Sequence, residues 1–252
     1  MLHLWQWPLL FGTGLVAGFV DAIAGGGGLI TVPVLLSFGL DPRRALGTNK
    51  LQASFGSGTA AWHYTQAKRV SLKDCTWGFL FSLTGAALGA ITVLKIDPSF
   101  LKRIIPVLLL AVAVYMLLKP KLGAVDIHPR WRRGWFDLIF GLGIGFYDGF
   151  LGPGTGTFWT MAYMLLLGFN LTRATGYTKV MNFASNFSSL VLFLWQRQVD
   201  FPAGLTMGLG QLIGARIGAS MVIAKGTRFI RPIFLAVVLA LTLKLVYENF
   251  RK

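Results

Sequence analysis

The strongest constraint on this chain is an internal duplication, because the stretch from Gly18 to Ala111 recurs from Gly145 onward. Asp21 recurs as Asp148 at a spacing of 127 residues (148 − 21), and beyond the glycine-rich segments the spacing becomes 129. The pairs at the second spacing include Gly39 and Gly168, Arg44 and Arg173, Gly47 and Gly176, Lys50 and Lys179, Gly85 and Gly214, Gly89 and Gly218, and Phe100 and Phe229. Transporter folds are often built from such repeats around a site near the membrane midplane. The sequence therefore predicts two homologous halves whose special residues occur in pairs.

Composition indicates that the solvent of this chain is lipid. Apolar residues form 54% of the 252 positions and charged residues 13%, too few charges to cover a soluble protein of this size. The runs from Cys75 to Leu94 and from Ile104 to Leu118 carry no charge. Each approaches the roughly 20 residues that cross a hydrocarbon layer about 30 Å thick. We expect an all-α polytopic membrane protein.

Two further features limit the chemistry. Met1 to Phe38 is apolar from the start and is longer than the apolar core of a signal peptide. We therefore interpret it as a segment that stays in the mature protein and is not cleaved off. Cys75 is the only cysteine, which excludes an intramolecular disulfide and a cysteine-based metal cage. The sequence has no metal-ligand cluster or phosphate-binding loop, so we expect neither a metal nor a cofactor.

The net charge of +15 is spread along the chain. Lysines and arginines lie between the apolar runs and do not gather on one soluble face, so we expect no nucleic-acid partner. Basic loops between spans are typical of contact with anionic lipid headgroups, and they also concentrate small anions near a pore mouth. The expected partners are therefore the lipid bilayer and a small anion.

The expected membrane segments follow the apolar runs. In the first half they are a broken stretch from Leu4 to Phe38 and spans at Leu46 to Tyr64, Cys75 to Leu94 and Leu101 to Leu118. In the second half they are a broken stretch from Trp135 to Phe169 and spans at Ala174 to Trp195, Phe201 to Ala224 and Phe229 to Tyr247. We expect a first transmembrane repeat over residues 1–118, a basic linker over 119–133, and a second repeat over 134–252. Each repeat holds about four membrane helices; five would make the halves inverted and four would make them parallel.

Each half contains a glycine-rich interruption, which is Gly25-Gly26-Gly27-Gly28 in the first and Gly152-Pro153-Gly154-Thr155-Gly156 in the second. Unwound backbone at membrane depth is tolerated only where it is buried in protein or lines a cavity. Helices starting at Leu29 and Thr157 would direct free N–H groups and positive dipole ends at an anion. Glycine also permits close helix packing, which we expect at Gly85-x-x-x-Gly89 and Gly214-x-x-x-Gly218. Recurrence of the interruption favours broken or re-entrant helices around a binding site.

A lysine follows near the start of an apolar helix in both halves, at Lys50 and at Lys179. A lysine inside a span costs about 3 kcal/mol and usually faces a partner or a watery cavity. The alternative is a side chain that extends to the headgroups from a helix end. Amides on the same helices, including Asn186, either complete a site or bond between helices. The candidate substrate-binding residues are Gly25, Gly26, Gly27, Gly28, Asn49, Lys50, Gln52, Gly152, Gly154, Thr155, Gly156, Thr178, Lys179 and Asn182.

Asp21 and Asp148 are carboxylates at equivalent places within apolar spans. A buried carboxylate is protonated, pairs with a cation, or caps free backbone N–H groups. Proton or sodium coupling is one interpretation of this pair. A structural salt bridge or cap is the other, and the sequence leaves both open.

The same residues resemble the signature of a known family. Gly18-Phe19-x-Asp21, the first glycine cluster, Pro33 and Gly47-Thr48-Asn49-Lys50, with Gly152-Pro153-Gly154 and Asn182-Phe183 in the second half, resemble the sulfite exporter TauE/SafE family of membrane permeases. The resemblance covers nearly the whole chain. It implies a bacterial inner-membrane, multi-pass transporter of small sulfur-containing anions such as sulfite or organosulfonates. Nothing in it distinguishes the anion, export from uptake, or a monomer from a homo-oligomer.

The sequence gives less support to functions other than transport. His3, His63 and His128 each lie near a terminus or loop, where a surface role is the default, so a membrane-embedded enzyme is disfavoured. Without a nucleotide motif, transport is expected to be secondary, by alternating access around a midplane anion site. A passive anion channel with the same pocket is the remaining alternative.

Overall fold

The computed structural model describes residues 4–97, 99–100, 107, 126 and 128–226. Within these residues the secondary structure is helical and contains no strand. The helices are α1 (Gln6–Ala24), α2 (Gly27–Ser37), α3 (Pro42–Gln66), the short 3₁₀ helix η1 (Lys73–Cys75), α4 (Thr76–Lys95), α6 (Arg133–Phe150), α7 (Thr155–Leu166), α8 (Leu171–Trp195) and α9 (Phe201–Lys225). The expected spans at Leu101 to Leu118 and Phe229 to Tyr247, and most of the linker, lie outside the described residues.

The predicted spans agree with the helices at some ends and are too short at others. The spans predicted from Cys75 and Phe201 match α4 and α9 within a residue at each end. By contrast, α3 and α8 begin before their apolar runs, because Asp41 and Asn170 cap the two helices through side chains that accept a backbone N–H. The predicted spans therefore start about one turn later than the helices do.

Both glycine-rich segments interrupt a helix, as predicted, but the helices that follow start earlier than expected. The starts predicted at Leu29 and Thr157 are wrong by two residues, since α2 begins at Gly27 and α7 at Thr155. The first break is short because Gly25, directly after the last residue of α1, adopts a left-handed φ of 80° that ends the helix. The two following helices have 11 and 12 residues. At about 1.5 Å per residue each is shorter than a hydrocarbon layer.

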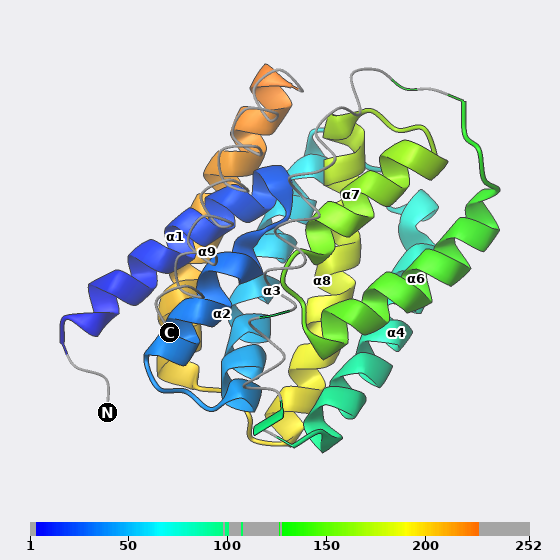
Figure 1. Cartoon of the computed structure of the whole chain (residues 1–252). Coiled ribbons are helices and arrows are strands. Elements are labelled where there is room, and N and C mark those ends of the chain that lie inside the picture. Colours follow the sequence, from blue (N-terminus) through cyan, green and yellow to red (C-terminus); the bar gives the residue numbers. More distant parts are fainter. Residues whose placement is uncertain (1–3, 98, 101–106, 108–125, 127, 227–252) are drawn as a thin grey trace.

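Long helices from the first part of the chain pack against long helices from the second part. α1 lies along α9 and α4 lies along α6, while α3 and α8 occupy the middle and touch one another (Figure 1). The predicted close packing at the small-residue motifs is confirmed. A Cβ on Gly85 would come 2.3 Å from the carbonyl oxygen of Leu142, and a Cβ on Gly214 would come 2.0 Å from that of Leu15. Leu142 and Leu15 are themselves 127 residues apart (142 − 15), so the two contacts are matched.

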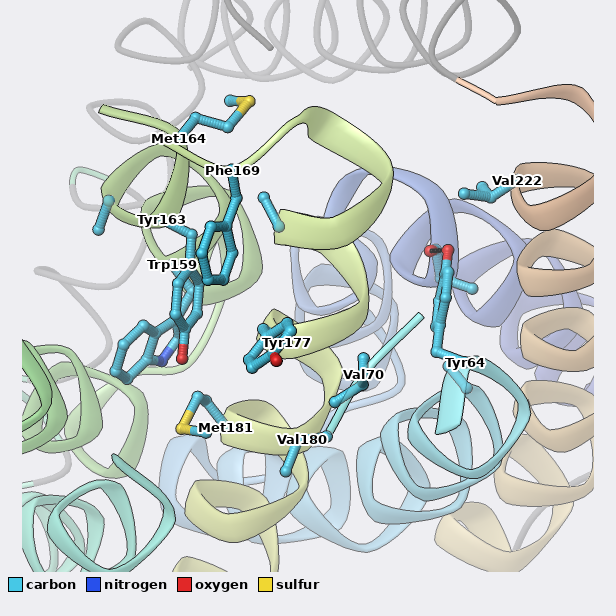
Figure 2. Close-up of a cluster of buried hydrophobic side chains, with 14 of the residues drawn as sticks. Tyr64, Val70, Trp159, Tyr163, Met164, Phe169, Tyr177, Val180, Met181 and Val222 are labelled. Atoms are coloured by element: carbon cyan, nitrogen blue, oxygen red, sulfur yellow. Dashed lines mark hydrogen bonds between the residues drawn. The ribbon is translucent and has the colours of Figure 1, made fainter. Parts of the chain in front are cut away.

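An aromatic cluster closes one end of α7 and α8. Figure 2 shows the rings of Trp159, Tyr163 and Phe169 beside one another, with Tyr177 facing them. The ring centroids of Trp159 and Tyr163 are 5.5 Å apart, and those of Phe169 and Tyr177 are 5.0 Å apart. The guanidinium of Arg173 lies 3.9 Å from the Phe169 centroid, a cation–π contact at the rim of this cluster.

The outer surface is apolar. Among the described residues, α1, α9 and the stretch Lys73–Lys95, which holds η1 and α4, are long and apolar enough to cross a membrane. One face of α9 exposes Leu205, Leu209, Leu212, Ile213 and Ile217. Exposed tryptophans lie near helix ends at Trp5, Trp62, Trp77, Trp135 and Trp195. Tryptophan concentrates at membrane–water interfaces, so this distribution fits a protein embedded in lipid.

Candidate functional site

The two glycine-rich breaks touch each other in the interior. A Cβ on Gly25 would lie 2.4 Å from the carbonyl carbon of Gly156, and a Cβ on Gly28 would lie 3.1 Å from the Cα of Pro153. The hydroxyl of Thr157, in the first turn of α7, donates to the carbonyl of Ala24 at the end of α1 (3.0 Å). Backbone approach this close is possible only because glycine carries no side chain.

A small polar cavity of about 30 Å³ lies between the breaks. It is lined by Asp21, Gly25, Gly27, Gly28, Asn49, Ala53, Asp148, Gly152, Gly154, Thr155, Gly156, Asn182, Asn186 and Gln211. The first turns of α2 and α7 both border it. The N–H groups of a first helical turn have no acceptor within their own helix, so they favour negative charge nearby.

Lys50 is buried on α3 and reaches across to α6. Its ammonium group lies 2.5 Å from Oδ1 of Asp148 and also donates to the backbone carbonyl of that residue and to Oδ1 of Asn186 (3.3 Å). The second carboxylate oxygen of Asp148 accepts from the hydroxyl of Ser185. The lysine side chain is 1% exposed, so it does not extend to the headgroups.

Lys179 on α8 makes the matching contact with the first part of the chain. Its ammonium group donates to Oδ2 of Asp21 on α1 (2.9 Å), and its side chain is fully buried. Oδ1 of Asp21 accepts from the backbone N–H of Gly27 at the start of α2 (3.3 Å). Of the alternatives open for the carboxylates, pairing with lysine holds for both and capping of the broken backbone holds for Asp21.

One threonine hydroxyl on each short helix makes a matched contact with a long central helix. Thr31 of α2 donates to Oδ1 of Asn49 (2.6 Å), which also accepts from the amide of Gln52 (2.7 Å). In the second part, the hydroxyls of Thr160 and Thr178 lie 3.0 Å apart. The hydroxyls of Thr31 and Thr160 also lie within hydrogen-bond distance of the Gly27 and Gly156 carbonyls of the breaks before them (3.2 Å and 2.8 Å), so the short helices are held against α3 and α8.

The structure brings most of the predicted site residues to the cavity, although not all of them form its wall. Gly26, Gln52 and Thr178, with both lysines, are the candidates that do not line it. Each lysine stands behind the carboxylate that it pairs with.

Sequence reasoning missed Gln211 and Ala53 as lining residues. An isolated amide within the apolar run of α9 was the available signal for Gln211, because such a residue in a span usually faces the protein interior. Ala53 carries no comparable signal.

An apolar exterior, helices interrupted at depth and a buried polar cavity together define an integral membrane protein of the transporter class. The comparisons with known proteins agree. The family model described as "Sulfite exporter TauE/SafE" matches residues 10–245. The chain belongs to this family, which confirms the resemblance of its glycine and lysine motifs.

Named relatives cover nearly the same length. A protein of Haemophilus influenzae named "Probable membrane transporter protein" is 44% identical over 96% of this chain and 94% of its own. "Probable membrane transporter protein YfcA" of Escherichia coli K12 is 41% identical over 96% of this chain and 90% of its own. "Probable membrane transporter protein YunE" of Bacillus subtilis is 23% identical over 94% of this chain and 96% of its own. No solved structure matches this chain.

Proposed function

We propose that this protein is a secondary permease, and not an enzyme, for small sulfur-containing anions such as sulfite or organosulfonates. The observation that carries the proposal is the meeting of two broken helices at a buried polar cavity with a lysine behind each side of it. Two first helical turns and two ammonium groups favour one oxyanion at this place. The sulfur chemistry is taken from the family description.

Alternating access is the mechanism proposed for this site. The cavity is small and the glycine breaks that line it touch each other, so passage of an anion requires the contacts around the breaks to open. The contacts of α1 with α9 and of α4 with α6 each join the first part of the chain to the second in a matched way, which supports the proposal of two homologous repeats. In this proposal α2 and α7 are re-entrant, and the protein lies in a bacterial inner membrane with several further spans.

The candidate residues take distinct roles in the proposed site. Lys50 and Lys179 supply positive charge, while the N–H groups of the breaks and the amides of Asn49 and Asn182 complete the coordination. Asp21 holds Lys179 in place until substrate arrives.

The test is flux of radiolabelled sulfite and of a sulfonate into proteoliposomes with an imposed pH gradient. Saturable flux against a concentration gradient is expected, whereas flux that only runs down its gradient would indicate a channel. Lys50→Ala and Lys179→Ala should each abolish or sharply reduce flux, while the exposed control Lys95→Ala should not. Normal flux in both buried-lysine variants, from folded protein, would show that the anion binds elsewhere.

A further inference from the structure

The two buried ion pairs differ in how firmly each lysine is held. Lys50 donates to three acceptors, two on Asp148 and one on Asn186. Lys179 donates to one acceptor in the described part of the chain, Oδ2 of Asp21. The residue 129 positions before Asn186 is Ser57, whose hydroxyl bonds to a carbonyl of its own helix instead. An ammonium group has three protons to donate, so Lys179 keeps donor capacity that Lys50 has used.

The carboxylates differ in the same direction. Asp148 is 3% exposed, and its second oxygen accepts from Ser185. The residue 129 positions before Ser185 is Gly56, which offers no hydroxyl. Asp21 is 19% exposed, and its second oxygen accepts only the longer bond from the backbone N–H of Gly27 at 3.3 Å among the described residues.

Two residues that line the cavity together with Asp21 carry acceptor atoms without donors among the described residues. Oδ1 of Asn182 and Oε1 of Gln211 are buried and have no hydrogen-bond partner in the described part of the chain. These side chains are 4% and 2% exposed. A buried acceptor without a donor costs about 1–3 kcal/mol, so a donor that appears in the cavity is stabilised there. A protonated carboxyl group is such a donor.

A bound anion disturbs the charge balance of the site, and uptake of a proton would restore it. The two lysines and two aspartates at the cavity carry two positive and two negative charges, which cancel. A bound anion adds a negative charge in a medium of low dielectric, where an uncompensated charge is costly. Protonation of one aspartate restores neutrality, and no metal cation then has to bind together with the anion.

We propose that Lys179–Asp21 is the exchangeable pair and Lys50–Asp148 the fixed pair. The anion replaces Asp21 at the Lys179 ammonium group, and Asp21 takes up one proton and donates its O–H to one of the free amide oxygens. One proton is thereby bound with each anion. This inference rests on the proposed function.

The groups that face Asp21 are few. They are Lys179 of α8, Tyr64 of α3, whose hydroxyl donates to the Ala22 carbonyl (3.1 Å), and Asp148 of α6 across the cavity. From α9 the facing group is the uncharged Gln211, α2 contains no titratable side chain, and α7 contributes the uncharged Thr155 and Gly156. Proton uptake therefore has one carboxylate open to it on this side of the cavity.

The first arm of the test uses no substrate. Double-mutant cycles on the melting temperature compare Lys50→Met with Asp148→Asn, and Lys179→Met with Asp21→Asn. The coupling between the two substitutions, measured as the non-additive part of the change in melting temperature, is expected to be larger for Lys50–Asp148. Equal coupling, or stronger coupling in Lys179–Asp21, would overturn the assignment of fixed and exchangeable pairs, whatever the protein transports.

The second arm measures binding of methanesulfonate to purified protein by titration between roughly pH 5 and pH 8. A sulfonate keeps its charge over this range, so any pH dependence belongs to the protein. Uptake of one proton tightens binding as pH falls, by up to about tenfold per pH unit. Asp21→Asn should remove this slope, and the exposed carboxylate control Asp97→Asn should retain it.

The outcomes separate the two proposals. A slope that survives in Asp21→Asn, or one that is lost equally in Asp97→Asn, would overturn proton exchange at Asp21. Absence of binding by either sulfite or sulfonate to the folded native protein would refute the anion site and the exchange with it, while the first arm would still rank the two pairs.

Discussion

A single methyl group at Gly25 tests whether the contact between the two breaks is as close as the structure has it. In Gly25→Ala the backbone φ of 80° is left-handed, which costs a non-glycine residue about 1–2 kcal/mol. The new Cβ would also lie 2.4 Å from the carbonyl carbon of Gly156 and 2.7 Å from the amide nitrogen of Thr157. Both are backbone atoms that cannot rotate away, and overpacking of this kind costs about 1–3 kcal/mol. The expected total is about 2–5 kcal/mol.

Gly39→Ala is the matched control, since Gly39 has a φ of 81° and no atom within 4 Å of the position of its Cβ. It should lose only the backbone part, about 1–2 kcal/mol. Thermal unfolding of both purified variants in detergent gives the comparison, and the difference of about 1–3 kcal/mol corresponds to roughly 2–12 °C in melting temperature. Equal melting temperatures for the two variants would refute the direct backbone contact between the breaks.

Three further substitutions test contacts in other parts of the fold. Gly89→Ala should destabilise the fold by about 1–3 kcal/mol, because its Cβ would lie 2.1 Å from the carbonyl oxygen of Phe146. Gly12→Ala, with nothing within 4 Å, should be neutral or stabilising by up to about 1 kcal/mol, and the reverse order in melting temperature would contradict the packing. Thr160→Val should cost about 1–2 kcal/mol in unfolding free energy by leaving the buried Thr178 hydroxyl without its partner. An unchanged melting temperature for this last variant would show that the hydroxyl finds another partner.

The sequence predicted the helical fold and the place of both interruptions because each depends on local composition. Apolar runs of span length and clusters of glycine are visible without any knowledge of neighbours. Helix starts at Pro42 and Leu171 were missed, since capping by Asp41 and Asn170 extends a helix past its apolar run. Their acceptor side chains were the available signal.

The candidate site was predictable in its members and not in its pairings. The recurrence of Lys50 and Asp21 at fixed spacings marks them as special, yet any of several partners satisfies a buried charge. That each lysine meets the carboxylate of the opposite part of the chain depends on how α3 and α8 lie against α6 and α1, which is a property of tertiary packing. The difference between the two pairs was equally invisible, because it depends on Ser185 facing a carboxylate.

Each buried ion pair joins the first part of the chain to the second, so its formation depends on the order of synthesis. Lys50 meets its counter-ion 98 residues later in the chain, and Asp21 meets its own 158 residues later. When the first part of the chain leaves the ribosome, it therefore carries one ammonium and one carboxylate group whose partners have not yet been synthesised. A buried charge without a partner is costly in lipid, so these helices stay near water until the later ones arrive. Burial of the Lys50–Asp148 pair thus requires synthesis to extend past Asp148, and burial of the Lys179–Asp21 pair requires it to extend past Lys179, so a fragment ending before Asp148 can form neither pair.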